Sequence, residues 1–335
     1  MNIIKNKSFK DLTTFHIGGK IKYYLEVSNV DEINEAMAFA EKNKLPIFII
    51  GEGSDFLASD KEFSGLVIKY IGNSYKIDGE FITADAGMSW DELVQISVEN
   101  GLQGLECLSG IPGTVGASPI QNIGAYGSEI SETFYKLEAF DLSGREIVTF
   151  TKDECDFGYR YSIFKSKECW QRFLILNVSF KLNKNAKGKV NYESLKGVVG
   201  ENPTLQEIRD GVLKVRREKL ENPKEHGNAG SFFKNPIIDS VKKDILLNEY
   251  PEAKIYPFED RFKVFAGWLI ENAGMKGKEL GGAAVSPKHA LILINKSGKA
   301  TANEIHDLSE LIISKVDEKF GIKLEREVQL INFNE

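Results

Sequence analysis

The stretch from Gly101 to Ile130 carries residue types suited to holding a ligand through the protein backbone. It contains seven of the thirty glycines in this 335-residue chain, and no charged side chain occurs between Cys107 and Ser128. Glycine accepts left-handed dihedrals and allows backbone to lie directly against a ligand. Backbone N–H groups and small polar side chains of this kind suit a large, flat, partly anionic ligand. A buried irregular crossover is the alternative interpretation. The small polar residues are Ser109, Thr114, Ser118, Gln121 and Asn122.

A second glycine turn, GEGSDFL at residues 51–57, directly follows the apolar residues 47–50. Its backbone N–H groups could face a diphosphate. The turn lacks the third glycine of the dinucleotide fingerprint G-x-G-x-x-G, because Phe56 occupies that place. We therefore do not expect a Rossmann nucleotide domain. A tight strand-to-loop turn without a ligand is the alternative.

Four cations lie within six residues near the end of a predicted helix: Lys214, Arg216, Arg217 and Lys219. In a chain of net charge −6, such a cluster suits a ligand that carries phosphate groups. A solvated basic helix face is the alternative interpretation.

Ser231 follows two glycines and precedes two phenylalanines in GNAGSFFKNP, residues 227–236. This pattern predicts a hydroxyl in a tight turn beside an apolar wall. Because the serine is not in a G-x-S-x-G elbow, we do not expect a hydrolase nucleophile. Near the end of the chain, Glu325 and Glu327 lie two residues apart on a predicted strand, so alternation places both on one side.

Composition excludes several classes of protein. The acidic net charge disfavours nucleic-acid binding. The three cysteines form no CxxC pair and leave an odd count, which favours a reducing, cytoplasmic setting. The four histidines lack metal-ligand spacing, so we expect no metal. The N-terminus lacks the apolar core of a signal peptide, and no apolar run reaches the roughly 18 residues of a membrane span.

Short strands and helices alternate along the chain without a regular repeat, which predicts an α+β fold. Capping boxes are predicted at Ser89–Glu92, Thr204–Glu207 and Thr301–Glu304. The predicted helices cover 31–43, 89–100, 204–220, 239–248 and 265–273, with a last one after Thr301. The predicted strands cover 22–27, 47–50, 64–69, 80–86, 137–142, 146–150, 172–182, 289–295 and 323–333.

Seven motifs in register carry a specific resemblance. They are TTFHIGG (13–19), GEGSDFL (51–57), IPGTVGASPIQNIGAYG (111–127), FGYRYSIFK (157–165), GNAGSFFKNP (227–236), GGAAV (281–285) and LEREV (324–328). Together they resemble the bacterial UDP-N-acetylenolpyruvoylglucosamine reductases, the flavoenzymes of the second committed step of peptidoglycan synthesis. The resemblance covers essentially the whole chain. FGYRYSIFK and a polar excursion around Tyr192 (187–195) look like the first structural type of that family.

The resemblance implies an FAD-binding domain of the vanillyl-alcohol-oxidase (PCMH) type, made of two subdomains at residues 1–67 and 68–219. A smaller α+β substrate domain would follow at 220–320, and residues 321–335 would return as a strand to the active site. The family's chemistry implies noncovalent FAD and NADPH as reductant. It also implies a UDP-sugar substrate, no nucleic-acid or membrane partner, a monomer, and a cytoplasmic enzyme of cell-wall biogenesis that bears on cell shape and division.

The resemblance also implies site residues. The catalytic residues would be Arg160, Ser231 and Glu327. The substrate would contact Tyr192, Arg216, Lys219, Asn235 and His289. FAD would contact Gly51, Gly53, Ser54, Asp55, Gly113, Gly116, Ala117, Ser118, Gln121, Asn122, Gly124, Ala125 and Tyr159.

The three catalytic residues suit the reaction chemically. Hydride added to the methylene carbon of an enolpyruvyl ether leaves negative charge delocalised towards its carboxylate, which a guanidinium such as Arg160 stabilises. A serine hydroxyl can protonate the α-carbon if the intermediate is basic enough. Glu327 could orient the arginine, relay a proton or hydrogen-bond the substrate acid. Taken alone, these residues would be read as an ion-paired arginine, a turn hydroxyl and a surface carboxylate.

Two motifs depart from the family pattern. The turn after Gly51 usually carries Asn where this chain has Asp55, and a carboxylate beside a diphosphate is unfavourable unless it points away. The last motif often has proline and a following arginine, where this chain has Arg326 and Gln329. A substrate contact from position 329 is therefore unsupported.

Two other functions remain open at this stage. An FAD oxidase or dehydrogenase acting on an alcohol or hydroxy acid would need neither Ser231 nor Glu327, and it would often carry a histidine for covalent flavin attachment. His16 and His289 could serve, but neither lies in the glycine-rich stretch. A flavin-binding regulatory protein would have lost the three catalytic residues, all of which are present.

Overall fold

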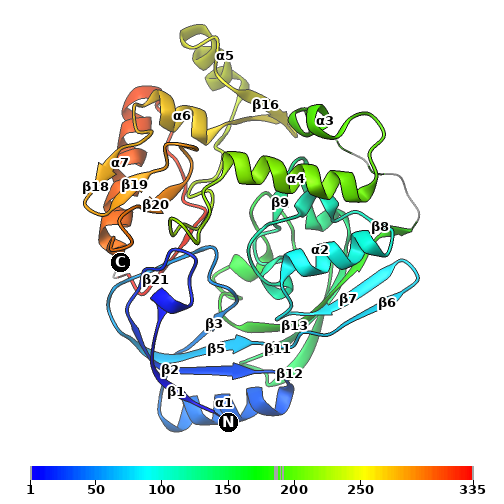
Figure 1. Ribbon diagram of the computed structural model, residues 1–335. Helices are drawn as coiled ribbons and strands as arrows, with labels where there is room; N and C mark the ends of the chain where they lie inside the picture. The colour runs from blue at the N-terminus through cyan, green and yellow to red at the C-terminus, as the bar shows by residue number, and fades with distance from the viewer. Residues whose placement is uncertain (1, 185–187, 189, 191, 334–335) are drawn as a thin grey trace. The chain divides into compact units, whose positions relative to one another are not determined.

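The computed structural model describes residues 2–184, 188, 190 and 192–333 (Figure 1). The backbone divides into two compact units. Unit 1 comprises residues 1–7, 21–52 and 64–218, and unit 2 comprises 8–20, 53–63 and 219–335. The finer division of the chain into FAD subdomains and a substrate domain stays a prediction.

The first layer of unit 1 is a four-stranded sheet packed against helix α1 (Val30–Lys42). The helix begins at Asn29, whose side chain accepts the N–H of Glu32. Its apolar residues recur at helical spacing and pack against Leu25 and Leu66 of the sheet. The strand order is β1 (Ile4–Ser8), β2 (Lys20–Val27), β5 (Phe63–Tyr70) and β3 (Ile47–Ile50), with β3 parallel to β5.

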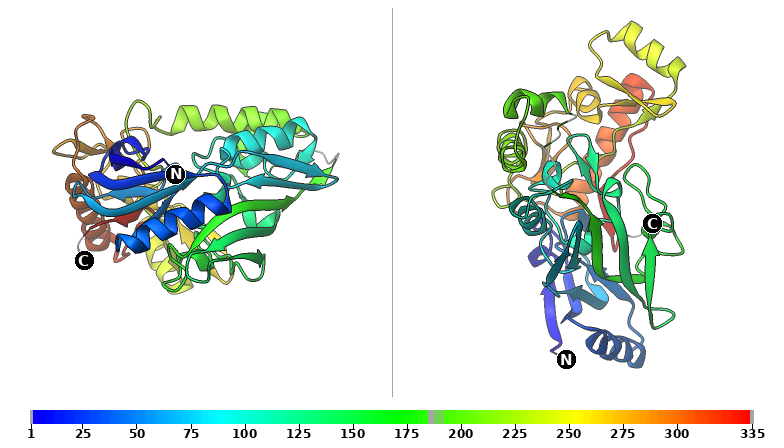
Figure 2. Two further views of the ribbon diagram at one scale, coloured as in Figure 1. Left: turned by 90° about the horizontal axis from the view of Figure 1, so that it is seen from below. Right: turned by 90° about the vertical axis from the view of Figure 1, so that its right-hand side faces the viewer.

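The second layer of unit 1 is a five-stranded antiparallel sheet. Its order is β12 (Glu146–Thr151), β11 (Phe134–Asp141), β13 (Phe173–Lys181), β7 (Phe81–Asp85) and β6 (Tyr75–Asp78). One face packs under helix α2 (Trp90–Glu99), where the Trp90 ring lies 5.7 Å from the ring of Phe180. Phe140, Leu174 and Leu176 pack instead with α1, which joins the two layers of the unit (Figure 2).

Helix α4 (Leu205–Lys219) lies beside α2 (Figures 1 and 2). A bidentate ion pair joins them, because Arg209 donates to both carboxylate oxygens of Asp91 at 2.6 and 2.9 Å. Asp91 also accepts the N–H of Gly110, so one carboxylate ties both the basic helix and the glycine-rich stretch to α2. The smaller elements here are α3 (Glu193–Val199) and strands β8 (Leu102–Gln103), β14 (Asn183–Lys184), β9 (Gly124–Ala125) and β10 (Ser128–Glu129).

The main core of unit 2 includes buried residues of helix α7 (Ala302–Phe320) together with Phe232 and Phe233. Two three-stranded sheets flank this core. They are β18 (Glu279–Leu280), β19 (Ala283–Val285) and β20 (Leu293–Asn295), and β15 (Ile237–Ile238), β17 (Arg261–Val264) and β16 (Ile255–Phe258). Strand β4 (Phe56–Ala58) pairs in parallel with β21 (Gln329–Ile331). The remaining helices are α5 (Ser240–Glu249) and α6 (Ala266–Asn272).

Most predicted helices and strands are confirmed, with three differences. The predicted Ser89 cap is wrong: its side chain makes no cap hydrogen bond, and its backbone forms a bridge with Thr114. The predicted strand 289–295 is regular only at 293–295, since the carbonyl of His289 accepts the N–H of Ile292 in a turn. The predicted strand 323–333 is regular only at 329–331. Both other capping boxes form, at Thr204–Glu207 and Thr301–Glu304.

Short 3-10 turns occur at Phe9–Asp11, Glu106–Leu108, Val115–Ala117, Ile130–Glu132 and Ile163–Lys165. Lys187, Lys189 and Asn191 of the predicted excursion lie outside the described residues. Among the residues that the structure does describe, no helix combines the length and apolar character that crossing a membrane requires.

Candidate active site

The glycine-rich stretch folds as irregular backbone in unit 1, as its composition predicts. Gly113 has φ +135°, a conformation that favours glycine. Gly116 is required for packing, because a methyl group there would lie 2.5 Å from Cβ of Ala86. The N–H of Gly116 also donates to the carbonyl of Ala86, just after β7. Close backbone packing against the sheet therefore explains Gly116 without a ligand.

Two side chains that the resemblance assigns to FAD, Ser118 and Asn122, are buried and have internal partners. The Ser118 hydroxyl donates to the carbonyl of Val115 at 2.7 Å. The Asn122 amide donates to Glu129 at 2.7 Å and accepts the N–H of Ser131. These bonds hold the loop in shape. A contact between either side chain and a cofactor stays a prediction, as it does for Ala117 and Ala125.

The first two residues of the GEGSD turn contact the glycine-rich stretch within unit 1. A methyl group on Gly51 would lie 3.1 Å from the hydroxyl of Thr114, and a carboxylate oxygen of Glu52 accepts the N–H of Gly113 at 3.1 Å. Two motifs assigned to the same cofactor thus meet. Thr114 is one of the small polar residues that the sequence pointed to, whereas sequence reasoning gave no role to Glu52, although its place inside the GEGSD motif was a usable signal.

The other residues of the turn belong to unit 2. Gly53 has φ +61°, and a methyl group there would lie 2.4 Å from the carbonyl oxygen of Leu12, so a larger residue does not fit. Asp55 precedes β4, and its carboxylate accepts a hydrogen bond from the Gln329 amide at 3.2 Å. Ser54 is half-buried between them.

Arg160, in unit 1, has φ +54°, which is uncommon for a residue other than glycine. Its guanidinium donates to the carbonyl of Gly124 at 2.8 Å and lies 5.3 Å from the centre of the Tyr159 ring. Arg160, Tyr159 and Gly124, three predicted site residues, therefore lie together. Strained backbone of this kind costs on the order of 1–3 kcal/mol and is concentrated at functional sites. Gln121 lies three positions before Gly124, and its amide oxygen is 3.5 Å from the amine of Lys165.

Two aromatic residues gather beside the basic helix in unit 1. The rings of Tyr126 and Tyr192 meet edge to face at 5.7 Å. Burial raises the pKa of the Tyr126 phenol, and the positive charge of Arg216 offsets part of that rise. Arg216 also packs against Gly110, where an added methyl group would lie 3.2 Å from its side chain. Tyr192 and Arg216, both predicted substrate residues, thus lie near one another, and Tyr126 is a neighbour that sequence reasoning missed. Its place between two glycines of the charge-free stretch was the available signal.

Ser231 and Glu327 lie on adjacent backbone segments of unit 2. Ser231 forms a bridge with Ile292 on one side. On the other side, the N–H of Glu327 donates to the carbonyl of Phe232 at 2.9 Å, and Phe233 pairs with Arg326. Both side chains are half-buried, whereas Phe232 and Phe233 are buried, as the predicted apolar wall requires.

The loop before Ser231 is fixed by the TTFHIGG motif of the same unit. The Thr14 hydroxyl donates to the carbonyl of Asn228 at 2.7 Å. A methyl group on Gly227 would lie 2.1 Å from the carbonyl oxygen of Phe15, so only glycine fits there. The Asn228 side chain accepts the N–H of Gly230, which has φ +68° and nothing within 4 Å of the place where a Cβ would lie. The turn at Ser231 is therefore positioned by residues more than 200 places earlier in the chain.

The predicted substrate residues of unit 2 differ in their surroundings. Lys219 is exposed, and His289 is half-buried. Burial, then the positive charges of Lys276 and Lys219, lowers the pKa of His289, so its imidazole is neutral near pH 7. Its Nδ1 accepts the N–H of Leu291 at 3.3 Å. The side-chain oxygen of Asn235 accepts the N–H of Ala266 at the start of α6, which is a structural role that its sequence position did not indicate.

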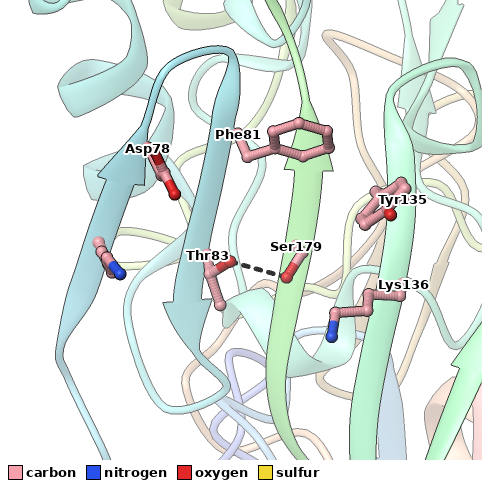
Figure 3. A pocket seen from close by; sticks show the side chains of 7 residues that line it. Asp78, Phe81, Thr83, Tyr135, Lys136 and Ser179 are labelled. Carbon is pink, nitrogen blue, oxygen red and sulfur yellow. Dashed lines mark hydrogen bonds between the residues drawn. The ribbon is translucent and has the colours of Figure 1, made fainter.

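A shallow hollow of about 180 Å³ lies on the five-stranded sheet, in unit 1 (Figure 3). At its floor the hydroxyls of Thr83 and Ser179 lie 2.7 Å apart. No predicted site residue lines it, so it takes no part in the proposed chemistry. Its lining is Lys76, Asp78, Phe81, Thr83, Tyr135, Lys136 and Ser179.

This chain is similar to known families, relatives and solved structures over most of its length. Residues 21–149 match a family model described as an FAD binding domain, and residues 222–331 match one described as the C-terminal domain of UDP-N-acetylenolpyruvoylglucosamine reductase. The reductase of Flavobacterium johnsoniae is 41% identical over 342 residues, covering 99% of this chain and 100% of its own. That of Pasteurella multocida is 39% identical, covering 95% and 94%. The crystal structure of the enzyme from Thermus caldophilus matches with a TM-score of 0.70 at 24% identity, covering 98% of each chain.

Proposed function

Because this chain belongs to the UDP-N-acetylenolpyruvoylglucosamine reductase family, we propose that it reduces an enolpyruvyl UDP-sugar with electrons that pass from NADPH through bound FAD. It is an FAD-dependent oxidoreductase of peptidoglycan synthesis. Its substrate is UDP-N-acetylglucosamine enolpyruvate, and the product is UDP-N-acetylmuramate. The choice of NADPH as the nicotinamide, a monomeric state and a cytoplasmic location are parts of the proposal.

The residues present fit FAD. Glu52 and Gly113 bring the two glycine motifs together in unit 1, where they form irregular, closely packed backbone. Gly53 and Gly113 have positive φ, which favours glycine, and Gly51 lies close to the Thr114 hydroxyl, so this backbone can lie against an extended ligand. Noncovalent binding is proposed, so acid precipitation should release all of the flavin from the yellow protein.

Each of the three proposed catalytic residues has its own role in the second half-reaction, in which the enolpyruvyl substrate reoxidises the flavin. FAD, when bound, would supply the transfer of a hydride from the nicotinamide to the methylene carbon of the enolpyruvyl group. The guanidinium of Arg160 stabilises the negative charge that develops towards the substrate carboxylate. The Ser231 hydroxyl gives its proton to the α-carbon. Glu327 either hydrogen-bonds the substrate acid or relays a proton.

The sugar nucleotide is bound through its phosphates and base. The cations Arg216 and Lys219 attract the diphosphate, and Tyr192 offers an aromatic face with a phenol. His289, neutral near pH 7, and Asn235 offer hydrogen bonds without adding charge. The Asn235 oxygen accepts the N–H of Ala266, which fixes the orientation of its side-chain amide.

One structural observation carries the choice of a reductase over an alcohol oxidase. Ser231 stands one residue from a backbone hydrogen bond to Glu327, in a turn held by Thr14 and Gly227. An oxidase has no use for an acid at this place, whereas reduction of an enol ether must deliver a proton to carbon.

Anaerobic mixing tests the function directly. NADPH should bleach the flavin absorbance, and the enolpyruvyl sugar nucleotide should restore it with formation of UDP-N-acetylmuramate. Bleaching by an alcohol or hydroxy acid, with no reoxidation by the sugar nucleotide, would identify an oxidase or dehydrogenase instead. A protein that holds no flavin after reconstitution with FAD would contradict both.

A further inference from the structure

Asp55 and Gln329 are two of the three positions at which this chain departs from the family pattern, and the structure pairs them. The side-chain amide of Gln329 donates to a carboxylate oxygen of Asp55 at 3.2 Å. The backbone N–H of Gln329 donates to the carbonyl of Asp55 at 3.0 Å. Both residues are half-buried, and they lie in the same unit although 274 positions separate them.

Their relative position is fixed by a short parallel ladder. Gln329, Leu330 and Ile331 pair with Phe56, Leu57 and Ala58, and Leu57 and Ile331 are buried. The N–H of Ser59 extends the ladder by donating to the carbonyl of Ile331. Because a ladder with a buried face resists a shift in register, the amide of Gln329 is held beside the last residue of the GEGSD turn.

The chemistry of the two side chains is complementary. An ionised carboxylate in a turn that faces a diphosphate repels it, and the repulsion is strongest when the carboxylate is free to rotate towards the phosphates. A hydrogen bond to an ionised group is among the stronger ones in proteins, so it can hold the carboxylate in one rotamer. The amide is neutral, so it fixes the position of the charge without cancelling it.

We propose that Gln329 is a positioning residue for the cofactor turn: its amide holds the Asp55 carboxylate on strand β21 and so lets an acidic residue stand beside the FAD diphosphate. This inference rests on the proposed assignment of the Gly51–Asp55 turn to FAD. It predicts that the two residues act on FAD affinity as a pair, and that their coupling is electrostatic.

The test is a double-mutant cycle on the FAD-free protein, with FAD affinity measured by quenching of flavin fluorescence. Gln329→Leu should weaken FAD binding about tenfold, and the loss should shrink as salt is raised, because a repulsion is screened. Asp55→Asn should bind FAD equally well or more tightly. In the Asp55→Asn background, Gln329→Leu should change affinity by less than about twofold, since no charge remains to be held.

Asn332→Gly provides a matched control on the same segment. It removes an amide that donates to the carbonyls of Lys61 and Glu62, and glycine accepts the φ of +59° at this position. Its FAD affinity should equal that of the native protein. Thermal unfolding of each FAD-free variant reports whether the fold itself has changed.

Three results would overturn the inference. If Gln329→Leu weakens FAD binding equally in both backgrounds and at all salt concentrations, the residue merely supports the strand. If it has no effect while Gly53→Ala weakens binding, the turn still holds FAD but Gln329 does not position Asp55. If neither Gly53→Ala nor Gln329→Leu changes affinity, the assignment of the turn to FAD fails as well.

Discussion

The backbone N–H of Glu327 donates to the carbonyl of Phe232, the residue directly after Ser231. This single hydrogen bond places the proposed acid and the proposed carboxylate on neighbouring segments of one unit, although 96 residues separate them in the chain. It also means that a change at either residue can be studied with the other still held in place by the backbone.

Ser231→Ala should separate the two half-reactions. Reduction of the flavin by NADPH needs no acid near the α-carbon, so its rate should be nearly native. Reoxidation by the enolpyruvyl substrate should slow by roughly 10²–10⁴-fold, the usual contribution of a positioned general acid. Stopped-flow absorbance of the flavin measures both steps.

Ser231→Cys keeps a proton donor in the turn and should recover part of the lost reoxidation rate. Equal slowing of both half-reactions in Ser231→Ala would mean that the serine shapes the pocket or positions the flavin. No slowing in either would make Glu327 the next candidate for the acid.

Lys219→Ala should raise the Michaelis constant for the UDP-sugar roughly tenfold through lost phosphate attraction, with flavin content unchanged. Lys214→Ala is the matched comparison, since Lys214 is an exposed cation of the same cluster and helix that the resemblance does not assign to the substrate. Steady-state kinetics measure the Michaelis constant, and the flavin-to-protein absorbance ratio measures the flavin content. Loss of FAD with intact substrate kinetics would show that this end of α4 serves the cofactor.

Asp91→Asn should destabilise the protein by about 2–3 kcal/mol, because it leaves the charge of Arg209 buried without its ionised partner. The Arg209 side chain is only 6% exposed, and the pair is bidentate. Urea unfolding measures the change. Asp210→Asn, on an exposed residue that accepts a hydrogen bond from Gln206 in the same helix, should cost less than about 0.5 kcal/mol. Similar costs for the two variants would show that the pair contributes little.

Asp141→Asn should reveal a pH-dependent contribution to stability. Hydrogen bonds from Arg172 lower the pKa of the Asp141 carboxyl from 3.8 to about 2 in the folded protein. A lowered folded-state pKa stabilises the fold above the ordinary pKa, and that stabilisation is lost as the pH falls from about 4 to about 2.

At pH 7 the variant should therefore be less stable by about 1–2 kcal/mol, a figure reduced because the Arg172 side chain is 41% exposed. The gap between native protein and variant should close by about pH 2. Unfolding of the FAD-free protein by urea across this range provides the measurement. A gap that stays constant with pH would mean that the ionised form of Asp141 is not what Arg172 stabilises.

Local signals in the sequence predicted the elements that depend on local forces. Thr301 and Glu304 correctly predicted the start of α7, because a capping box is complete within four residues. The same pattern at Ser89 does not form a cap hydrogen bond, and the Ser89 backbone instead pairs with Thr114, which lies 25 residues away. The strand predicted at 289–295 is shorter than expected for a different, local reason, since a turn from His289 to Ile292 interrupts it.

The candidate site depended on contacts that no local pattern reveals. Sequence reasoning selected Ser231 and Glu327 by resemblance, but it could not show that Thr14 and Gly227 hold the turn between them. It also judged Asp55 and Gln329 as two separate departures, because only the register of β4 with β21 makes them neighbours. Asn235 was assigned to substrate from its motif alone, and its bond to Ala266 became visible only in the fold.

The hydrogen bond from Thr14 to Asn228 has a consequence for how the chain is made. The two residues are 214 positions apart, so Thr14 leaves the ribosome long before its partner exists. At roughly 5–20 residues per second, the wait is on the order of ten to forty seconds. Until then residues 8–20 lack the segment that completes their unit and remain open to proteases and chaperones. Expression of residues 222–331 alone, the stretch that matches the C-terminal family model, would likewise omit the supports of the Ser231 turn. Unit 2 therefore needs both the first and the last segments of the chain to be synthesised before it can become resistant to degradation.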